Sequence, residues 1–284
     1  MEIPFVFKND ILKGQWAFIT GGGSGLGLAM AHRMAMAGAD VVLASRRKEL
    51  CEEQAALIAQ EHGVRAIGLG VNVRDSDAVV ACLAEAARGM DRDTLDIMVN
   101  NAAGNFYYPS HMLSDNQWKA VLEIDLYGTF HCSRAAYPYM KEKGGLILSI
   151  STTLHHNGWA CMLPACAAKS GIDALTRTLA VEWARHKIRV NAIAPGPIPT
   201  EGVKKAFAGS GSFESDFSRI PLGRAGEPEE VGDLAVFLAS PAATWITGEI
   251  IILDGGEHLS PNRQAVDPEE LAAKVLAARG SAEG

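Results

Sequence analysis

The sequence lacks the features of several protein classes. No apolar run approaches the roughly 20 residues that a membrane span needs, so we expect no membrane partner. The formal net charge is −7 over 284 residues, whereas nucleic-acid-binding domains usually carry a basic face. These absences favour a globular protein that binds a small molecule and no nucleic acid.

The cysteines are few and show no paired pattern. They have neither CxxC nor metal-ligand spacing, which predicts reduced thiols, no metal site and a cytoplasmic location. The first residues include Glu2 and Asp10 and no long apolar core, unlike a signal peptide, and residues 281–284 are not a peroxisomal address. The five cysteines are Cys51, Cys82, Cys132, Cys161 and Cys166.

Short apolar runs alternate with amphipathic segments along most of the chain. This alternation predicts an α/β fold: a single Rossmann-type doubly wound parallel sheet of about seven strands, flanked by helices. We expect one domain over residues 1–260 and a C-terminal tail, 261–284, with a peripheral helix. Strands are expected at 16–19, 41–44, 66–71, 95–99, 146–150, 189–194 and 250–253, and longer helices at 48–62, 76–88, 116–143, 164–186 and from 228.

A glycine-rich loop joins the first expected strand to the first helix. Glycine permits positive φ and close approach of the backbone to a ligand, and the N-terminus of a helix favours a phosphate charge. The context of strand, loop, helix and second strand predicts a dinucleotide site rather than a structural turn. The predicted cofactor-binding residues of this loop are Gly21, Gly23, Ser24, Gly25, Leu26 and Gly27.

The ends of the next two strands indicate which dinucleotide binds. Arg46 and Arg47 follow the second strand, where a cation would pair with a 2′-phosphate and a carboxylate would bind a ribose diol. We therefore predict NADP(H) over NAD(H), although the arginines could simply begin a solvated helix. Asn72 and Val73 follow the third strand, and Asn72 suits an adenine edge or an ordinary turn.

From about residue 14 to 259 the sequence resembles the short-chain dehydrogenase/reductase family. The matching segments are 20–27, which fit its TGxxxGxG loop, 100–104, which fit its NNAG segment, the Pro195-Gly196 turn, and 245–248 with 254–256. The resemblance implies cofactor contacts at Asn101, Ala102, Pro195, Gly196 and Ile198. It also implies a catalytic, cofactor-binding lysine at Lys169 and a homotetramer.

Three positions depart from the common catalytic pattern of this family. Ala165 stands where a tyrosine delivers the proton, Asp125 replaces an asparagine, and the serine position falls near Thr152. A methyl group cannot transfer a proton, which argues against ordinary carbonyl reduction. The changes resemble the 2,4-dienoyl-CoA reductase branch, especially its peroxisomal type, and imply NADPH-dependent reduction of an acyl-CoA substrate to a 3-enoyl-CoA in unsaturated fatty acid degradation.

The resemblance also implies roles for the replacing residues. Asp125 and Lys169 would hold a water that gives the proton, while Asn105 and Thr152 are candidate donors to the thioester oxygen. Alternatives stay open: Asp125 could be a structural acceptor for backbone N–H groups, and His155, Tyr107 or Tyr108 could supply the proton. Rival functions are a 2-enoyl-CoA reductase and a non-catalytic NADPH-binding protein.

The segment after the sixth strand is a candidate for coenzyme A and acyl-chain contacts. Its cations could pair with phosphates even on an acidic protein, and its aromatic residues could close over an acyl chain or simply pack on the core. The cations are Lys204, Lys205, Arg219 and Arg224, and the aromatic residues are Phe207, Phe213 and Phe217.

Overall fold

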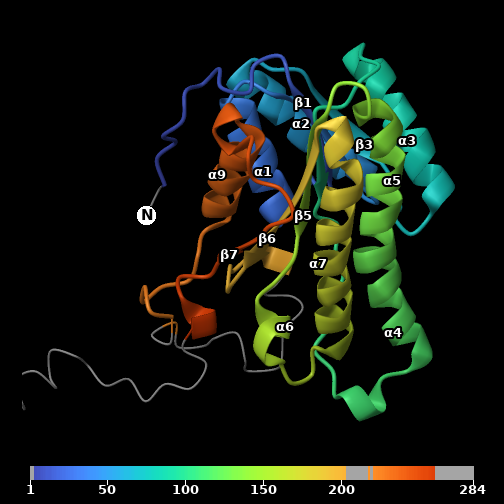
Figure 1. Ribbon diagram of the computed structural model, residues 1–284, viewed down its shortest axis with the longest axis vertical. Helices are drawn as coiled ribbons and strands as arrows, with labels where there is room; N and C mark the ends of the chain where they lie inside the picture. The colour runs from blue at the N-terminus through green and yellow to red at the C-terminus, as the bar shows by residue number, and fades with distance from the viewer. Residues whose placement is uncertain (1–2, 203–216, 218–219, 260–284) are drawn as a thin grey trace, which may run out of the picture.

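A seven-stranded sheet runs through the residues described in this computed structural model, which are 3–202, 217 and 220–259 (Figure 1). Its order is β3-β2-β1-β4-β5-β6-β7, and every neighbouring pair is parallel. The predicted doubly wound fold is therefore confirmed. The strands are β1 (Trp16–Thr20), β2 (Asp40–Ser45), β3 (Ala66–Gly70), β4 (Ile97–Asn100), β5 (Gly145–Ile150), β6 (Ile188–Pro195) and β7 (Ile250–Leu253).

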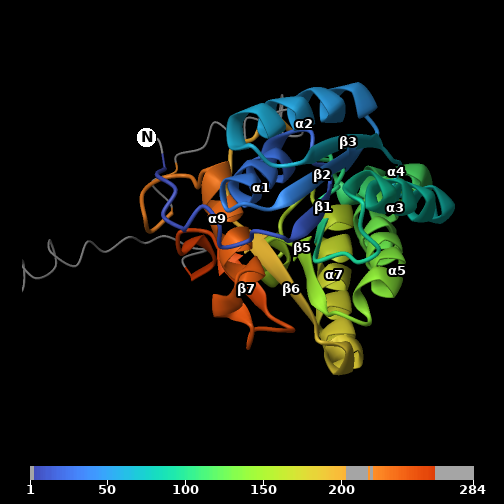
Figure 2. The same cartoon turned by 90° about the horizontal axis from the view of Figure 1, so that it is seen from above.

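Helices cover both faces of the sheet (Figure 2). One apolar core joins the sheet to α1 (Gly25–Met36), α2 (Lys48–His62) and α9 (Pro228–Ala239). A second core lies on the opposite face, against α3 (Ser76–Met90), α5 (Gly128–Met140) and α7 (Leu163–Trp183). None of the described helices combines the length and apolar composition that crossing a bilayer requires.

The central strand β1 shows why the sheet must be covered on both faces. Ala17 and Ile19 belong to one core, while Trp16 and Phe18 belong to the other, because successive side chains of a strand point to opposite faces. All five residues of β1 are buried. A continuous apolar run of this kind marks an interior parallel strand, as the sequence predicts.

Local signals in the sequence set several helix ends. The predicted helix 48–62 matches α2, which ends at Gly63 in a left-handed conformation with φ 69°. The carboxylate of Asp75 caps α3 by accepting from the backbone N–H groups of Asp77 and Ala78.

The predicted helical stretch over 116–143 is confirmed from 115 to 140, but its middle turn is π-helical, which the sequence does not predict. The structure has α4 (Asp115–Leu122), a π-helical turn at Glu123–Tyr127, and then α5. In that turn the Asp125 carboxylate accepts a hydrogen bond from the backbone N–H of Gly104, 21 residues earlier in the sequence. Helical periodicity cannot predict such a contact. The expected loop between β5 and α7 likewise contains a short helix, α6 (Leu154–Asn157).

Some predictions fall outside the described residues. These are the C-terminal tail 261–284 with its helix, and most of the segment expected to contact coenzyme A, including Lys204, Lys205, Phe207, Phe213 and Arg219.

Candidate active site

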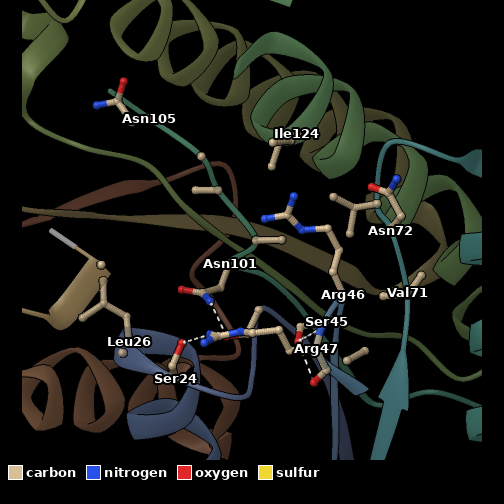
Figure 3. Close-up of a pocket in the computed structure, with 18 of the residues that line it drawn as sticks. Ser24, Leu26, Ser45, Arg46, Arg47, Val71, Asn72, Asn101, Asn105 and Ile124 are labelled. Atoms are coloured by element: carbon tan, nitrogen blue, oxygen red, sulfur yellow. Dashed lines mark hydrogen bonds between the residues drawn. The ribbon is translucent and has the colours of Figure 1, made fainter. Parts of the chain in front are cut away.

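A cavity of about 700 Å³ lies at the carboxyl ends of the first four strands (Figure 3). Strand β1 is flanked there by β2 on one side and β4 on the other, so the cavity occupies the point where the strand order reverses. Open α/β sheets bind ligands at such a point. The predicted cofactor residues that line the cavity are Gly21, Ser24, Gly25, Leu26, Arg46, Arg47, Asn72, Val73, Asn101 and Ala102.

The glycine loop is fixed against the end of β4. The side-chain amide of Asn101 donates to the carbonyls of Thr20 and Gly21, at 3.0 and 3.3 Å. Gly21 has φ +65°, and a Cβ there would lie 2.8 Å from Asn101 Nδ2. This close approach accounts for glycine at the position and leaves the backbone exposed to the cavity, a cradle that fits the diphosphate of a dinucleotide.

Gly23 and Gly27 are absent from the cavity lining and serve packing instead. A Cβ on Gly27 would lie 2.4 Å from the Gly21 carbonyl oxygen, and one on Gly23 would lie 3.2 Å from Cys51 Sγ. The two residues let α1 and α2 approach the loop closely. Their predicted cofactor role is therefore indirect in this structure.

Two arginines place positive charge beside the loop. Arg47 donates to Ser24 Oγ at 2.8 Å, and Figure 3 shows the Arg46 guanidinium pointing into the cavity between Asn101 and Asn72. None of the described residues that line the cavity is an aspartate or glutamate. The arrangement therefore favours a ligand with several negative charges.

A buried ion pair lies between the π-helical turn and α7. Lys169 Nζ is 3.5 Å from Asp125 Oδ2 and donates to the Ile150 carbonyl at 2.7 Å. Asp125 Oδ1 accepts from the backbone N–H of Gly104 at 2.8 Å. The structure thus brings together the two residues that the sequence paired, and it also gives Asp125 the structural hydrogen bond of the alternative interpretation.

Burial raises the pKa of Asp125 above its ordinary value, against the opposing effects of the Lys169 charge and the Gly104 hydrogen bond. A carboxyl in this environment holds a proton more readily than a solvated aspartate does. Ala165 lies one helical turn before Lys169 on α7 and is itself buried, and its methyl group has no atom that could transfer a proton.

A second buried network lies beside this pair, and the sequence reasoning missed its centre. Asp173 accepts from Ser151 Oγ at 2.6 Å through one carboxylate oxygen, and its other oxygen lies 2.8 Å from His155 Nε2. Its helical spacing, four residues after Lys169 on α7, could have revealed it. The predicted Thr152 is half-buried, and its Oγ1 accepts from the Leu154 N–H at 3.4 Å.

Asn105 lines the cavity of about 700 Å³, on the loop that follows β4. Its Nδ2 donates to Met162 Sδ at 3.2 Å, a weak acceptor, and its buried Oδ1 has no partner among the described residues. A 180° rotation of the side-chain amide exchanges the positions of Nδ2 and Oδ1. The side chain is therefore free to offer a donor or an acceptor to a bound molecule.

The predicted residues Pro195, Gly196 and Ile198 are not among the described residues that line the cavity at the ends of the first four strands. Gly196 and Ile198 line a smaller cavity of about 70 Å³ together with Asp254, and Pro195 ends β6. Arg224, predicted to contact phosphates, also lines this smaller cavity and is held by Glu230 through two hydrogen bonds of 2.9 and 2.7 Å. The structure thus pairs Arg224 with a carboxylate, a contact that charge patterning did not predict.

The sheet order and the cavity at its reversal point define a doubly wound, dinucleotide-binding protein. A family model described as "Enoyl-(Acyl carrier protein) reductase" matches residues 21–258. Together with the relatives below, this match shows that the chain belongs to the short-chain dehydrogenase/reductase family, whose members use nicotinamide cofactors.

Relatives of this chain include reductases and solved structures. It is 40% identical to the peroxisomal 2,4-dienoyl-CoA reductase [(3E)-enoyl-CoA-producing] of Danio rerio, over 90% of this chain and 85% of that protein. It is 43% identical to a Bacillus subtilis (strain 168) protein named "Probable 2,4-dienoyl-CoA reductase [(2E)-enoyl-CoA-producing]", over 86% and 96%. A short-chain type dehydrogenase/reductase structure from Mycobacterium marinum matches with a TM-score of 0.80 and 31% identity, over 87% and 96% of the chains.

Proposed function

We propose that this protein is an NADPH-dependent 2,4-dienoyl-CoA reductase that yields 3-enoyl-CoA. The observation that carries the proposal is the buried Lys169–Asp125 pair beside Ala165, where a carbonyl reductase would need a tyrosine. The names of the relatives support the same substrate class. The site lies within the proposed single domain, residues 1–260.

The cofactor would be held by the glycine loop and the N-terminus of α1, with Arg46 and Arg47 on a 2′-phosphate. When bound, reduced nicotinamide supplies the hydride that adds to C5 of the diene. Negative charge then spreads from the diene to the thioester oxygen. Because this dienolate is delocalised, no tyrosine is needed to neutralise an alkoxide, and hydrogen-bond donors such as Asn105 and Thr152 would stabilise the charge.

Protonation at C2 completes the reaction, and Asp125 with Lys169 would hold the water that delivers the proton. The Ile150 carbonyl holds Lys169 Nζ and the Gly104 N–H holds Asp125 Oδ1, so both side chains are fixed in place. His155 is the second candidate proton donor. Its Nε2 lies 2.8 Å from the buried carboxylate of Asp173, which fixes the imidazole ring in place.

The proposed substrate class is tested by following NADPH oxidation with 2,4-hexadienoyl-CoA, crotonyl-CoA and a simple ketone. We expect rapid turnover of the dienoyl thioester alone. Preference for crotonyl-CoA would identify a 2-enoyl-CoA reductase. Tight NADPH binding without turnover of any of the three would identify a non-catalytic protein.

The choice of NADP(H) is tested at Arg46. Arg46→Ala removes a charge-assisted contact worth about 1.5–3 kcal/mol, so we expect the Kd for NADPH to rise about 10-fold to 100-fold while that for NADH changes little. The measurement is titration of protein fluorescence with each cofactor. Arg88→Ala, an exposed arginine on α3, is the control. Equal weakening of NADPH and NADH binding would argue against a phosphate contact.

We further propose that the protein assembles as a homotetramer in the cytoplasm. Trp245 is 99% exposed and Val181 81% exposed. Gly248, three residues after Trp245, packs against Ala180, which precedes Val181: a Cβ on Gly248 would lie 3.5 Å from Ala180 Cβ. The exposed side chains of Trp245 and Val181 therefore belong to neighbouring segments of the surface. The five cysteines are free, and reduced thiols are typical of proteins in reducing compartments.

The assembly is tested by sedimentation velocity. Trp245→Lys should convert the tetramer to a smaller species, because a buried lysine would lack a partner in an apolar interface. Val80→Lys, on exposed α3 surface, should leave the wild-type state unchanged. A wild-type monomer would overturn this proposal.

A further inference from the structure

Two histidines and a glutamate meet on the face of the sheet that α1 and α2 cover. His32 comes from α1, while Glu61 and His62 are the last residues of α2, just before Gly63 ends the helix. Figure 2 shows these helices side by side. His32 Nδ1 lies 3.1 Å from His62 Nε2 and 3.6 Å from Glu61 Oε2, and the last two groups are 3.7 Å apart.

These separations match the edges of a metal coordination shell. Nitrogen and oxygen ligands lie about 2.0–2.2 Å from Zn²⁺, so two ligands at a tetrahedral angle are roughly 3.3–3.5 Å apart. Imidazole and carboxylate together suit zinc and neighbouring transition metals. Without an ion, one imidazole can donate its N–H to the other across the same 3.1 Å.

The electrostatic environment also suits a cation. Burial and the neighbouring His32 lower the pKa of His62, while Glu61 opposes the shift. Arg33 is the nearest cationic residue along α1, and it is neutralised by Asp233 at 3.4 Å. The side chains of His32, His62 and Glu61 are 30%, 17% and 54% exposed, so an ion can reach the cluster.

We propose that His32, Glu61 and His62 form a binding site for one divalent transition-metal ion per chain, with zinc as the representative. The ion links α1 to the end of α2 through three protein ligands and keeps a coordination position open for water. The same residues line a cavity of about 1070 Å³ on this face, so the open position faces solvent-accessible space. The site is separate from the proposed reductase chemistry and does not rest on it.

The test is calorimetric titration of chelator-treated, reduced full-length protein with zinc chloride. We expect one zinc ion per chain and at least a tenfold loss of affinity in His32→Gln and in His62→Gln. Glu61→Gln removes an exposed ligand, and we expect it to weaken binding without affecting the fold. His111→Gln, an exposed histidine elsewhere, should bind zinc within twofold of wild type.

A second readout separates loss of the site from loss of the fold. Zinc at about 100 times its Kd should raise Tm by roughly 5 °C or more in wild type and not in the double variant H32Q/H62Q. The metal-free Tm of each variant reports folding. The proposal is overturned if wild type binds no zinc. It is also overturned if the double variant H32Q/H62Q still binds zinc while the double variant Cys161→Ser with Cys166→Ser does not, because the cysteines would then be the ligands.

Discussion

Replacing Lys169 with methionine is expected to lower kcat for the dienoyl thioester by about 10²- to 10⁴-fold, the usual range for loss of a proton-transfer group. Methionine keeps much of the apolar stem but cannot donate to the Ile150 carbonyl or pair with Asp125. Because Asp125 is only 1% exposed, the remaining carboxylate would take up a proton or destabilise the fold by about 3–5 kcal/mol. Steady-state kinetics and Tm measure the two effects.

Asp125→Asn is the matched variant for this result. The asparagine keeps an oxygen that accepts from the Gly104 N–H and removes only the charge. We expect kcat to fall about 100-fold while NADPH still binds, whereas Lys169→Met should lose affinity for NADPH as well. Wild-type kcat in the asparagine variant would show that Asp125 is a structural acceptor. If His155→Gln alone abolished the reaction, His155 would replace the bound water as donor.

Gly27→Ala is expected to have the largest effect on the cofactor cradle. The added Cβ would lie 2.4 Å from the Gly21 carbonyl oxygen and 2.5 Å from Asn101 Nδ2, so the loop and the end of β4 must separate. Alanine gains up to about 1 kcal/mol in a helix interior. The clash with backbone outweighs this gain, and we expect a net loss of about 2 kcal/mol or more in unfolding free energy.

Thermal unfolding with and without NADPH checks this prediction. Tm should fall by at least roughly 3 °C, and NADPH should restore little of it because the cradle is distorted. Gly202→Ala is the control, since among the described residues a Cβ there meets only Thr200 Oγ1 at 3.8 Å, beside the same cavity. An unchanged Tm and Kd in Gly27→Ala would contradict the packing role assigned to this glycine.

The parts of the fold that depend on local signals could be predicted from sequence. Strand β1 is apolar from Trp16 to Ile19. Gly63 ends α2 in a left-handed conformation that few other residues adopt, and the Asp75 side chain caps the start of α3. The glycine loop, Arg46 and Asn72, which the sequence assigns to one dinucleotide site, line the same cavity because parallel strands end at one edge of the sheet.

The features that depend on contacts between distant segments could not be predicted in this way. The π-helical turn at Asp125 is stabilised by Gly104, 21 residues away, and no periodicity in the sequence marks it. The spacing of Asp173 after Lys169 indicates a shared face of α7, but its partners Ser151 and His155 approach it only in the folded chain. The His32 and His62 pair likewise arises from packing of α1 on α2. The two histidines are 30 residues apart in the sequence, so no short metal-ligand motif predicts their proximity.

The most direct test of the proposed reaction is the structure of the product that NADPH and 2,4-hexadienoyl-CoA give in deuterated water. Hydride addition at C5 followed by protonation at C2 predicts 3-hexenoyl-CoA with solvent deuterium at C2. Deuterium at C4 of a 2-hexenoyl-CoA would contradict the proposed position of the proton donor. Absence of any product, with NADPH bound, would contradict the reductase assignment itself.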